Sequence, residues 1–219
     1  MSGWAAIFDW DGVVIDSSAQ HEKSWELLAA EKELFLPPDH FKQGFGKKNE
    51  LIIRTILNWS QDPAEVAALG DRKEVLYREL VRDHGVTILP GARELLHELR
   101  EAGIPRAVGS STPQDNLDAI FRATGLGVLF DAVVCGDDVV HGKPAPDVFL
   151  KAASLLNIPP AQCVVFEDAL FGIEAAQRAG MKVIAVATTN PPELLRHADG
   201  VVPTLAGVRL ADLQRLFVG

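Results

Sequence analysis

The sequence is poor in positive charge: 21 Lys and Arg residues stand against 30 Asp and Glu, for a formal net charge of -9. A protein that binds nucleic acid or an anionic membrane surface needs a basic patch, so we expect neither kind of partner. Only two cysteines occur, Cys135 and Cys163, and both lie in apolar stretches without metal-ligand spacing. We predict that they are buried free thiols.

Long apolar runs, internal repeats and low-complexity segments are missing as well. No apolar run approaches the roughly 20 residues that span a bilayer, and the chain enters its first strand without a charged-then-apolar leader. We therefore expect a soluble, cytoplasmic protein, and a monomer. With 219 residues, 47% of them hydrophobic, the chain can bury the core of one large domain or of one domain with an insertion.

The first apolar run of the sequence ends in a pair of acids. Ala5–Phe8 predicts a buried strand, and Asp9, Asp11 and Gly12 follow it at once. Residues at i and i+2 of an extended chain point the same way, so the two carboxylates are expected to lie together. Such a pair repels itself unless a cation neutralises it or one acid holds a proton. Taken alone, the pattern fits a catalytic site and an Asx-type turn with solvated acids equally well.

The remaining chain divides into a helical stretch and an alternating stretch. Residues 17–86 show only helical patterns, interrupted at Pro37-Pro38 and at a glycine-bracketed basic loop, Gln43–Lys48. Beyond them, short apolar runs alternate with helical patterns, which predicts a parallel sheet with helices on both faces. The predicted fold is α/β: a Rossmann-like core (residues 1–16 and 87–219) with an inserted four-helix cap domain (residues 17–86).

Local signals place the individual elements of this fold. Thr112 is predicted to cap a helix over 113–124, Asn49 a helix over 51–59, and Asp62 a helix that runs to about residue 83. Besides 5–8, strands are predicted at 105–109, 131–135, 163–166, 182–187 and 200–202, and the other core helices at 92–102, 146–157, 172–179 and 210–217.

Polar residues follow three further strands of the predicted sheet. After 105–109, the Ser110 hydroxyl and nearby N–H groups at a helix start offer an anion site, although simple helix capping explains them too. Lys143 stands on a loop stiffened by Pro144 and is either a neutralising group or a solvated lysine. Glu167 and Asp168 follow a buried run, and hard oxygen ligands in small number suit Mg²⁺. Ligands of such sheets bind where the strand order reverses.

These four motifs stand in one order at successive strand ends, and in this the chain resembles the haloacid dehalogenase superfamily of phosphotransferases over essentially its whole length. The helical insertion resembles the cap of the family's helical-cap subclass, which includes sugar phosphatases and beta-phosphoglucomutase. The resemblance implies that Asp9 is the nucleophile that becomes an aspartyl-phosphate and that Asp11 is the general acid and base. It also implies that Ser110 and Lys143 hold the transferred phosphoryl group. The second acid separates the chain from the family's dehalogenases.

The resemblance further implies a Mg²⁺ cofactor and a small phosphorylated substrate. Metal ligands would come from Asp9, Asp11 (through its backbone carbonyl), Glu167 and Asp168. Contacts to the substrate would come from His21, Trp25, Gly46, Lys47, Lys73, Ser111 and Thr112. Without the resemblance, Trp25 would be ordinary core and His21 a satisfied, partly buried imidazole.

Three departures from the mutases of the family favour a phosphatase over a mutase. Lys47 stands where the mutases carry arginine, and a lysine cannot bind phosphate in the bidentate way that an arginine can. Pro113 stands where the mutases carry lysine. The third departure is Ala169, which follows Glu167 and Asp168. We therefore predict a Mg²⁺-dependent phosphatase that hydrolyses a small phosphomonoester, a sugar phosphate, through an aspartyl-phosphate. The alternatives are a beta-phosphoglucomutase, which is an isomerase, and a non-catalytic metabolite-binding protein, which is disfavoured because no catalytic position has been lost.

Overall fold

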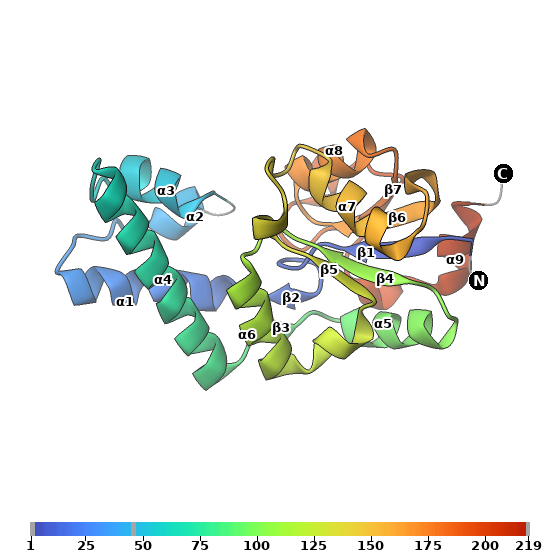
Figure 1. Cartoon of the computed structure of the whole chain (residues 1–219), viewed down its shortest axis with the longest axis horizontal. Coiled ribbons are helices and arrows are strands. Elements are labelled where there is room, and N and C mark those ends of the chain that lie inside the picture. Colours follow the sequence, from blue (N-terminus) through green and yellow to red (C-terminus); the bar gives the residue numbers. More distant parts are fainter. Residues whose placement is uncertain (1–2, 45–46, 218–219) are drawn as a thin grey trace. The chain divides into compact units, whose positions relative to one another are not determined.

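The computed structural model describes residues 3–44 and 47–217, and the chain forms two compact units (Figure 1). The core comprises Met1–Asp16 and Thr87–Gly219, and the inserted unit comprises Ser17–Val86. The role of the inserted unit as a cap domain stays a prediction. Among the described residues, no helix combines the length and the apolar character that crossing a membrane requires.

The sheet of the core has six strands in the order β5-β4-β1-β6-β7-β8, and neighbouring strands pair in parallel. Along the chain, β4 and β5 join the sheet on one side of β1, and β6, β7 and β8 then join it on the other side. The strand order therefore reverses at β1. The predicted α/β class is confirmed. The strands are β1 (Ala5–Phe8), β4 (Arg106–Gly109), β5 (Ala132–Val134), β6 (Cys163–Glu167), β7 (Lys182–Val186) and β8 (Gly200–Val202).

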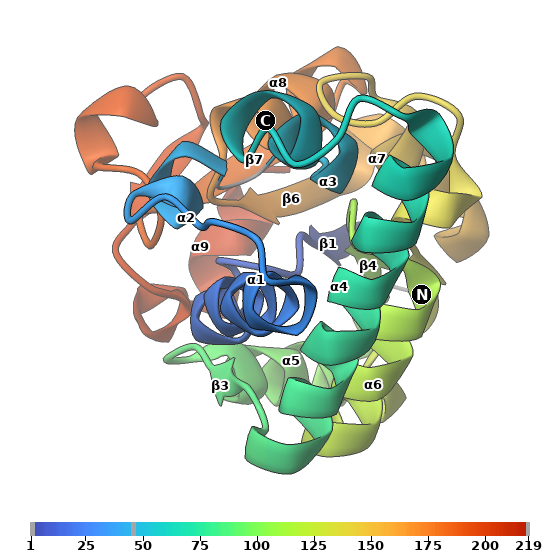
Figure 2. The same cartoon turned by 90° about the vertical axis from the view of Figure 1, so that its left-hand side faces the viewer.

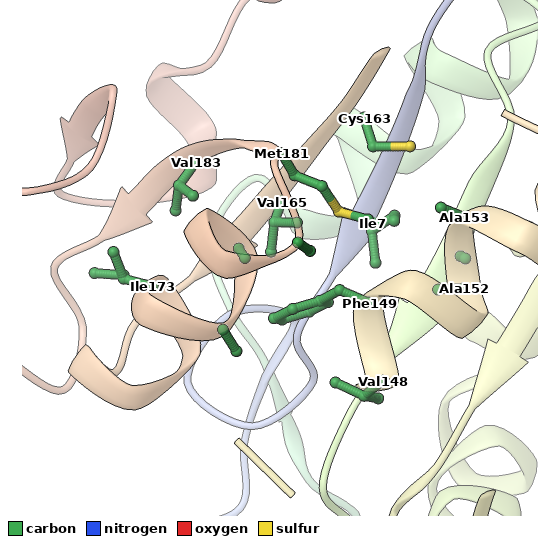
Figure 3. Close-up of a cluster of buried hydrophobic side chains, with 14 of the residues drawn as sticks. Ile7, Val148, Phe149, Ala152, Ala153, Cys163, Val165, Ile173, Met181 and Val183 are labelled. Carbon is green, nitrogen blue, oxygen red and sulfur yellow. The ribbon is translucent and has the colours of Figure 1, made fainter. Parts of the chain in front are cut away.

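Helices cover both faces of this sheet, with α7 and α8 on one face and α5 and α9 on the other (Figure 1). On the first face, Ile7 and Val165 of the sheet pack with Phe149 of α7 and Ile173 of α8 (Figure 3). Full burial of such a side chain stabilises the fold by roughly 1.5–3 kcal/mol, so this cluster anchors β1 and β6 beneath their carboxyl ends. The core helices are α5 (Ala92–Glu101), α6 (Gln114–Thr124), α7 (Asp147–Leu156), α8 (Leu170–Arg178) and α9 (Leu210–Arg215).

Within the inserted unit, α1 packs against α4 (Figure 2). Trp25 and Leu28 of α1 and Leu76 of α4 belong to one buried apolar cluster. As predicted, Asp62 caps α4, because its Oδ1 accepts the Glu65 N–H at 2.9 Å. The helices are α1 (Ser18–Lys32), α2 (His40–Gly44), α3 (Asn49–Leu51), its π-helical continuation η1 (Ile52–Ile56) and α4 (Pro63–His84).

A two-stranded antiparallel ribbon of the core, which the sequence did not predict, stands at the two ends of the insertion. Its strands are β2 (Ile15–Asp16) and β3 (Thr87–Ile88), and Asp16 pairs with Thr87. Strands this short carry no alternation of apolar and polar residues from which they could be recognised.

Two predicted helix caps are wrong. Thr112 does not cap α6, which begins at Gln114; the carboxylate of Asp137, from the loop after β5, accepts the Gln114 N–H at 2.9 Å instead. Asn49 is the first residue of α3 rather than its cap, and its side chain donates to Oε1 of Glu74 at 2.6 Å. At α6, a carboxylate distant in sequence thus takes the capping role predicted for Thr112. At α3, the Asn49 side chain bonds a distant carboxylate and does not cap the helix.

Candidate active site

The polar residues predicted at the strand ends converge in the core. Asp9 follows β1 and Ser110 follows β4, while Glu167 ends β6 and Asp168 comes next. Because β1 pairs with both β4 and β6, these residues leave the sheet at one edge, where the strand order reverses. All four side chains are buried. The three acids are therefore not the solvated acids that the first motif alone allowed.

Lys143 is the cation of this cluster. Its Nζ donates to Oδ1 of Asp9 at 2.7 Å and to Oε1 of Glu167 at 2.8 Å, and it lies 4.7 Å from the centroid of the Phe149 ring. The side chain is only 9% exposed. Burying an ammonium group is costly unless it is paired, and here two carboxylates pair it. The alternative of a solvated loop lysine does not describe this residue.

Two glycines allow the carboxylates to approach the backbone this closely. Gly12 has a φ of +80°, and a Cβ there would lie 2.1 Å from Oδ2 of Asp168. A Cβ on Gly172 would lie 1.6 Å from Oε1 of Glu167, whose Oε2 accepts the Ala169 N–H at 2.7 Å. Gly172 was not among the residues predicted for the site. The sequence feature that could have indicated it is a glycine in the first turn of a helix that follows a pair of acids.

The carboxylates suit a divalent cation. Oxygen atoms of Asp9, Glu167 and Asp168 all lie within 4.8 Å of one another. With the ammonium of Lys143, these three carboxylates leave a net charge of minus two when ionised. Mg²⁺ would balance that charge, and carboxylate oxygens are the ligands it prefers. The residues present therefore fit Mg²⁺, with Asp9, Glu167 and Asp168 as candidate ligands; the backbone carbonyl of Asp11 stays a predicted one.

Burial and neighbouring charges shift the pKa values of the cluster. Burial raises the pKa of Asp9 to about 7, against the opposing pull of Lys143. Burial, and then the charge of Glu167, raises the pKa of Asp168 to about 8. Burial alone would lower the pKa of Lys143, but the charges of Asp9 and Glu167 outweigh it and raise that pKa. Without metal, the site thus keeps its lysine charged and favours protonation of Asp9 and Asp168.

Asp11, the second acid of the first motif, contacts the loop that follows β4. The Thr112 hydroxyl donates to Oδ2 of Asp11 at 2.7 Å, and the Thr112 N–H donates to the Ser110 Oγ at 3.0 Å. Because the Ser110 hydroxyl accepts this bond, its own hydrogen is available for an anion. Ser111 is exposed. The predicted contacts of Ser111 and Thr112 with substrate stay predictions.

In the inserted unit, two predicted substrate residues lie against each other. Lys73 is buried, and its Nζ lies 2.7 Å from Nδ1 of His21 and 3.0 Å from Oε1 of Glu74. The His21 ring stacks on Tyr77 with ring centroids 4.0 Å apart. The unit therefore holds a buried, hydrogen-bonded cation beside an imidazole.

The other substrate residues predicted in this unit have different surroundings. Trp25 is 3% exposed and belongs to the apolar cluster, as expected of core, and its ring meets Trp59 edge-on at 5.8 Å. Lys47 is exposed. Gly46 lies outside the described residues. Roles for these residues in substrate binding stay predictions.

Fold and site together define an α/β enzyme with a buried carboxylate–lysine cluster at the strand-order reversal of a parallel sheet. A sequence model of the haloacid dehalogenase-like hydrolases matches residues 5–180, and the chain belongs to that family. The predicted family is confirmed, and with it the prediction of a hydrolase.

Similar proteins include phosphatases and mutases. The chain is 36% identical to the chloroplastic 5-amino-6-(5-phospho-D-ribitylamino)uracil phosphatase of Arabidopsis thaliana over 98% of its length, but spans only 58% of that protein. It is 35% identical to the beta-phosphoglucomutase of Mycobacterium tuberculosis, covering 92% of this chain and 90% of the mutase. The crystal structure of a HAD hydrolase of family IA, variant 3, from Entamoeba histolytica matches with a TM-score of 0.87 and 28% identity, over 97% of this chain and 98% of the other.

Proposed function

We propose that the chain is a Mg²⁺-dependent phosphatase that hydrolyses a small phosphomonoester, a sugar phosphate, through an aspartyl-phosphate on Asp9. The observation that carries this proposal is the position of Lys143, whose Nζ donates to Oδ1 of Asp9 and Oε1 of Glu167 in the buried cluster. A carboxylate can approach an anionic phosphate only where positive charge offsets their repulsion. Relatives named as a phosphatase and as a phosphoglucomutase support a phosphorylated, sugar-like substrate.

The first half of the reaction transfers the phosphoryl group to the protein. A carboxylate oxygen of Asp9 attacks phosphorus, the bond from phosphorus to the ester oxygen breaks, and Asp11 gives that oxygen a proton. The Ser110 hydroxyl and the Lys143 ammonium bind oxygens of the moving group. Mg²⁺, when bound by the carboxylate cluster, supplies positive charge that offsets the repulsion between Asp9 and the substrate.

The second half returns the protein to its starting state. Asp11, now ionised, takes a proton from a water molecule whose oxygen attacks the phosphorus of the aspartyl-phosphate. The bond between phosphorus and Asp9 breaks, and inorganic phosphate leaves. Asp11 ends the cycle protonated, ready for the next ester.

The chain lacks cations that a phosphomutase would need, and this favours hydrolysis of the sugar phosphate over its isomerisation. A mutase must hold a bisphosphorylated intermediate while it turns over, which requires cations for both phosphates. Lys47 offers a point charge where the mutases carry arginine, and Pro113 offers none. Each missing charge-assisted contact is worth on the order of 1.5–3 kcal/mol, so the intermediate would leave at least about tenfold sooner.

The proposal is tested with a panel of sugar phosphates, with phosphate release measured in the presence of Mg²⁺. For beta-glucose 1-phosphate, glucose 6-phosphate is measured as well, with and without beta-glucose 1,6-bisphosphate. We expect steady phosphate release that the bisphosphate does not stimulate. Glucose 6-phosphate that accumulates faster than phosphate, and only with the bisphosphate, would identify a mutase. Asp9→Asn is the control, because it keeps the shape of the side chain and removes the attacking charge.

The proposed substrate contacts of the inserted unit have a separate test. Lys73→Met and Lys47→Ala should weaken turnover of the best sugar phosphate more than turnover of p-nitrophenyl phosphate, which has no sugar to bind. Lys42→Ala, at an exposed position of α2, serves as a charge-matched control. Equal losses on both substrates would show that Lys73 and Lys47 only stabilise the unit.

A further inference from the structure

Thr112 and Asp11 are joined by a hydrogen bond that neither helix capping nor substrate binding explains. The threonine hydroxyl donates to Oδ2 of Asp11 at 2.7 Å, although the residues lie 101 positions apart. We infer that Thr112 is a positioning residue that fixes the side-chain orientation of Asp11, so that the acid stays aligned in both halves of the reaction. This inference rests on the proposed function, in which Asp11 gives up a proton and later takes one.

A hydroxyl group is suited to this task because it can donate and accept. It donates to Asp11 when the acid is a carboxylate and can accept from it when the acid is protonated. A backbone N–H or a lysine could only donate, so it would hold one of the two states alone. Threonine also has a branched Cβ, which restricts rotation about χ1. Serine has no such branch.

The backbone of Thr112 is itself fixed from two sides. Its N–H donates to the Ser110 Oγ at 3.0 Å, and its carbonyl accepts the Gly136 N–H at 2.9 Å. Next to Gly136, the carboxylate of Asp137 accepts the Gln114 N–H, which holds the start of α6. The loop after β5 thus supports the loop after β4. A continuous series of hydrogen bonds runs from Ser110, the proposed phosphate contact, through Thr112 to Asp11.

Three threonine variants test this role against a purely structural one. Thr112→Val keeps the shape of the side chain but removes the hydroxyl, and Thr112→Ser keeps the hydroxyl. Thr124→Val is the matched control: its hydroxyl donates to the Ile120 carbonyl at the end of α6. Circular dichroism and thermal unfolding establish that each variant folds, and Thr112→Ala replaces Thr112→Val if that variant does not.

The readout is the dependence of rate on the leaving group. Phenyl phosphate and p-nitrophenyl phosphate have similar shapes, but phenol is the weaker acid, so its ester needs a proton from Asp11 more. Thr112→Val should lower kcat/KM for phenyl phosphate roughly tenfold more than for p-nitrophenyl phosphate, a fraction of the 10²–10⁴-fold typical of general acid catalysis. Thr112→Ser should restore most of the ratio of the two rates, and Thr124→Val should leave it unchanged.

Other results would overturn the inference. Equal losses on both esters in Thr112→Val would assign Thr112 to substrate binding or to the loop alone, and unchanged rates on both esters would show that Asp11 needs no such support. The proposed function fails separately: if the unmodified protein releases no phosphate from either aryl ester or from the sugar phosphates, that proposal falls and this inference with it.

Discussion

The ammonium of Lys143 lies 2.7 Å from Oδ1 of Asp9, although 134 positions separate the two residues in the sequence. One short loop thus brings a cation to the residue proposed as the nucleophile. Because both side chains are buried, each depends on the other for its charge. Breaking such a pair leaves a buried charge without compensation.

Lys143→Met should therefore cost both stability and activity. We expect the free energy of unfolding without metal to fall by about 3 kcal/mol, and phosphate release to fall by more than about a hundredfold. Urea unfolding in chelator and steady-state kinetics with Mg²⁺ measure the two effects. Lys182→Met is the control: its partner is Asp199 on the surface, a kind of pair worth about 0–1 kcal/mol. Similar losses in both variants would contradict the importance of the buried pair.

The metal-free protein should be less stable at higher pH. Burial raises the pKa of Asp9 to about 7 and that of Asp168 to about 8, from a usual 3.8. Between about pH 4 and about pH 8 the folded state therefore binds more protons than the unfolded chain, so the free energy of unfolding falls as the pH rises.

Mg²⁺ should reverse this trend, because it binds the ionised carboxylates and competes with their protons. The increase in Tm on adding Mg²⁺ should then be small near pH 5 and larger near pH 8. Thermal unfolding across this range, in chelator and in Mg²⁺, measures both trends. A metal-free Tm that rises with pH, or a Mg²⁺ effect independent of pH, would contradict the assignment of the cluster as a metal site.

Gly172→Ala should disable the site while leaving most of the sheet intact. The new Cβ would lie 1.6 Å from Oε1 of Glu167, so that carboxylate must move away from Lys143. We expect loss of activity and a weaker Mg²⁺-induced increase in Tm. Gly207→Ala is the control, because nothing lies within 4 Å of its added Cβ. Normal Mg²⁺ binding by Gly172→Ala would show that Glu167 is dispensable there.

Asp137→Ala should destabilise the start of α6, since the lost carboxylate accepts the Gln114 N–H. Loss of a capping acceptor costs about 1 kcal/mol, with a range of roughly 0.5–2 kcal/mol. Asp137→Asn keeps an acceptor oxygen and should lose much less. Urea unfolding of the two variants compares them directly, and equal losses would assign the effect to the charge of Asp137 rather than to the cap.

The strands of the core could be predicted because a parallel sheet covered on both faces leaves each strand almost continuously apolar. β1 and β8 occur with the predicted bounds, and the other strands of the six-stranded sheet differ from the prediction only at their ends. Since parallel strands end at one edge, the meeting of Asp9 with Glu167 also followed from the sequence. The resemblance to the family added roles to these residues, and those roles stay predictions.

What the sequence could not show depends on contacts between distant residues. The cap of α6 comes from Asp137, in a loop that follows a different strand. The burial of Lys143 depends on its contacts with Asp9 and Glu167, which come from other strands, whereas its own loop, stiffened by Pro144, left a solvated lysine open. Thr112 looked like a helix cap because threonine often precedes helices, but its hydroxyl has a carboxylate within reach.

The ribbon of β2 and β3 has a consequence for how the chain can be altered. Because Asp16 pairs with Thr87, the two ends of the 17–86 segment lie one strand spacing apart. A tight hairpin turn could join the two strands directly, since antiparallel neighbours need as few as about two connecting residues. The core is therefore a candidate for expression as a shortened protein, and the segment for exchange with those of relatives. In such hybrids the substrate range could be followed with Asp9 and Lys143 unchanged.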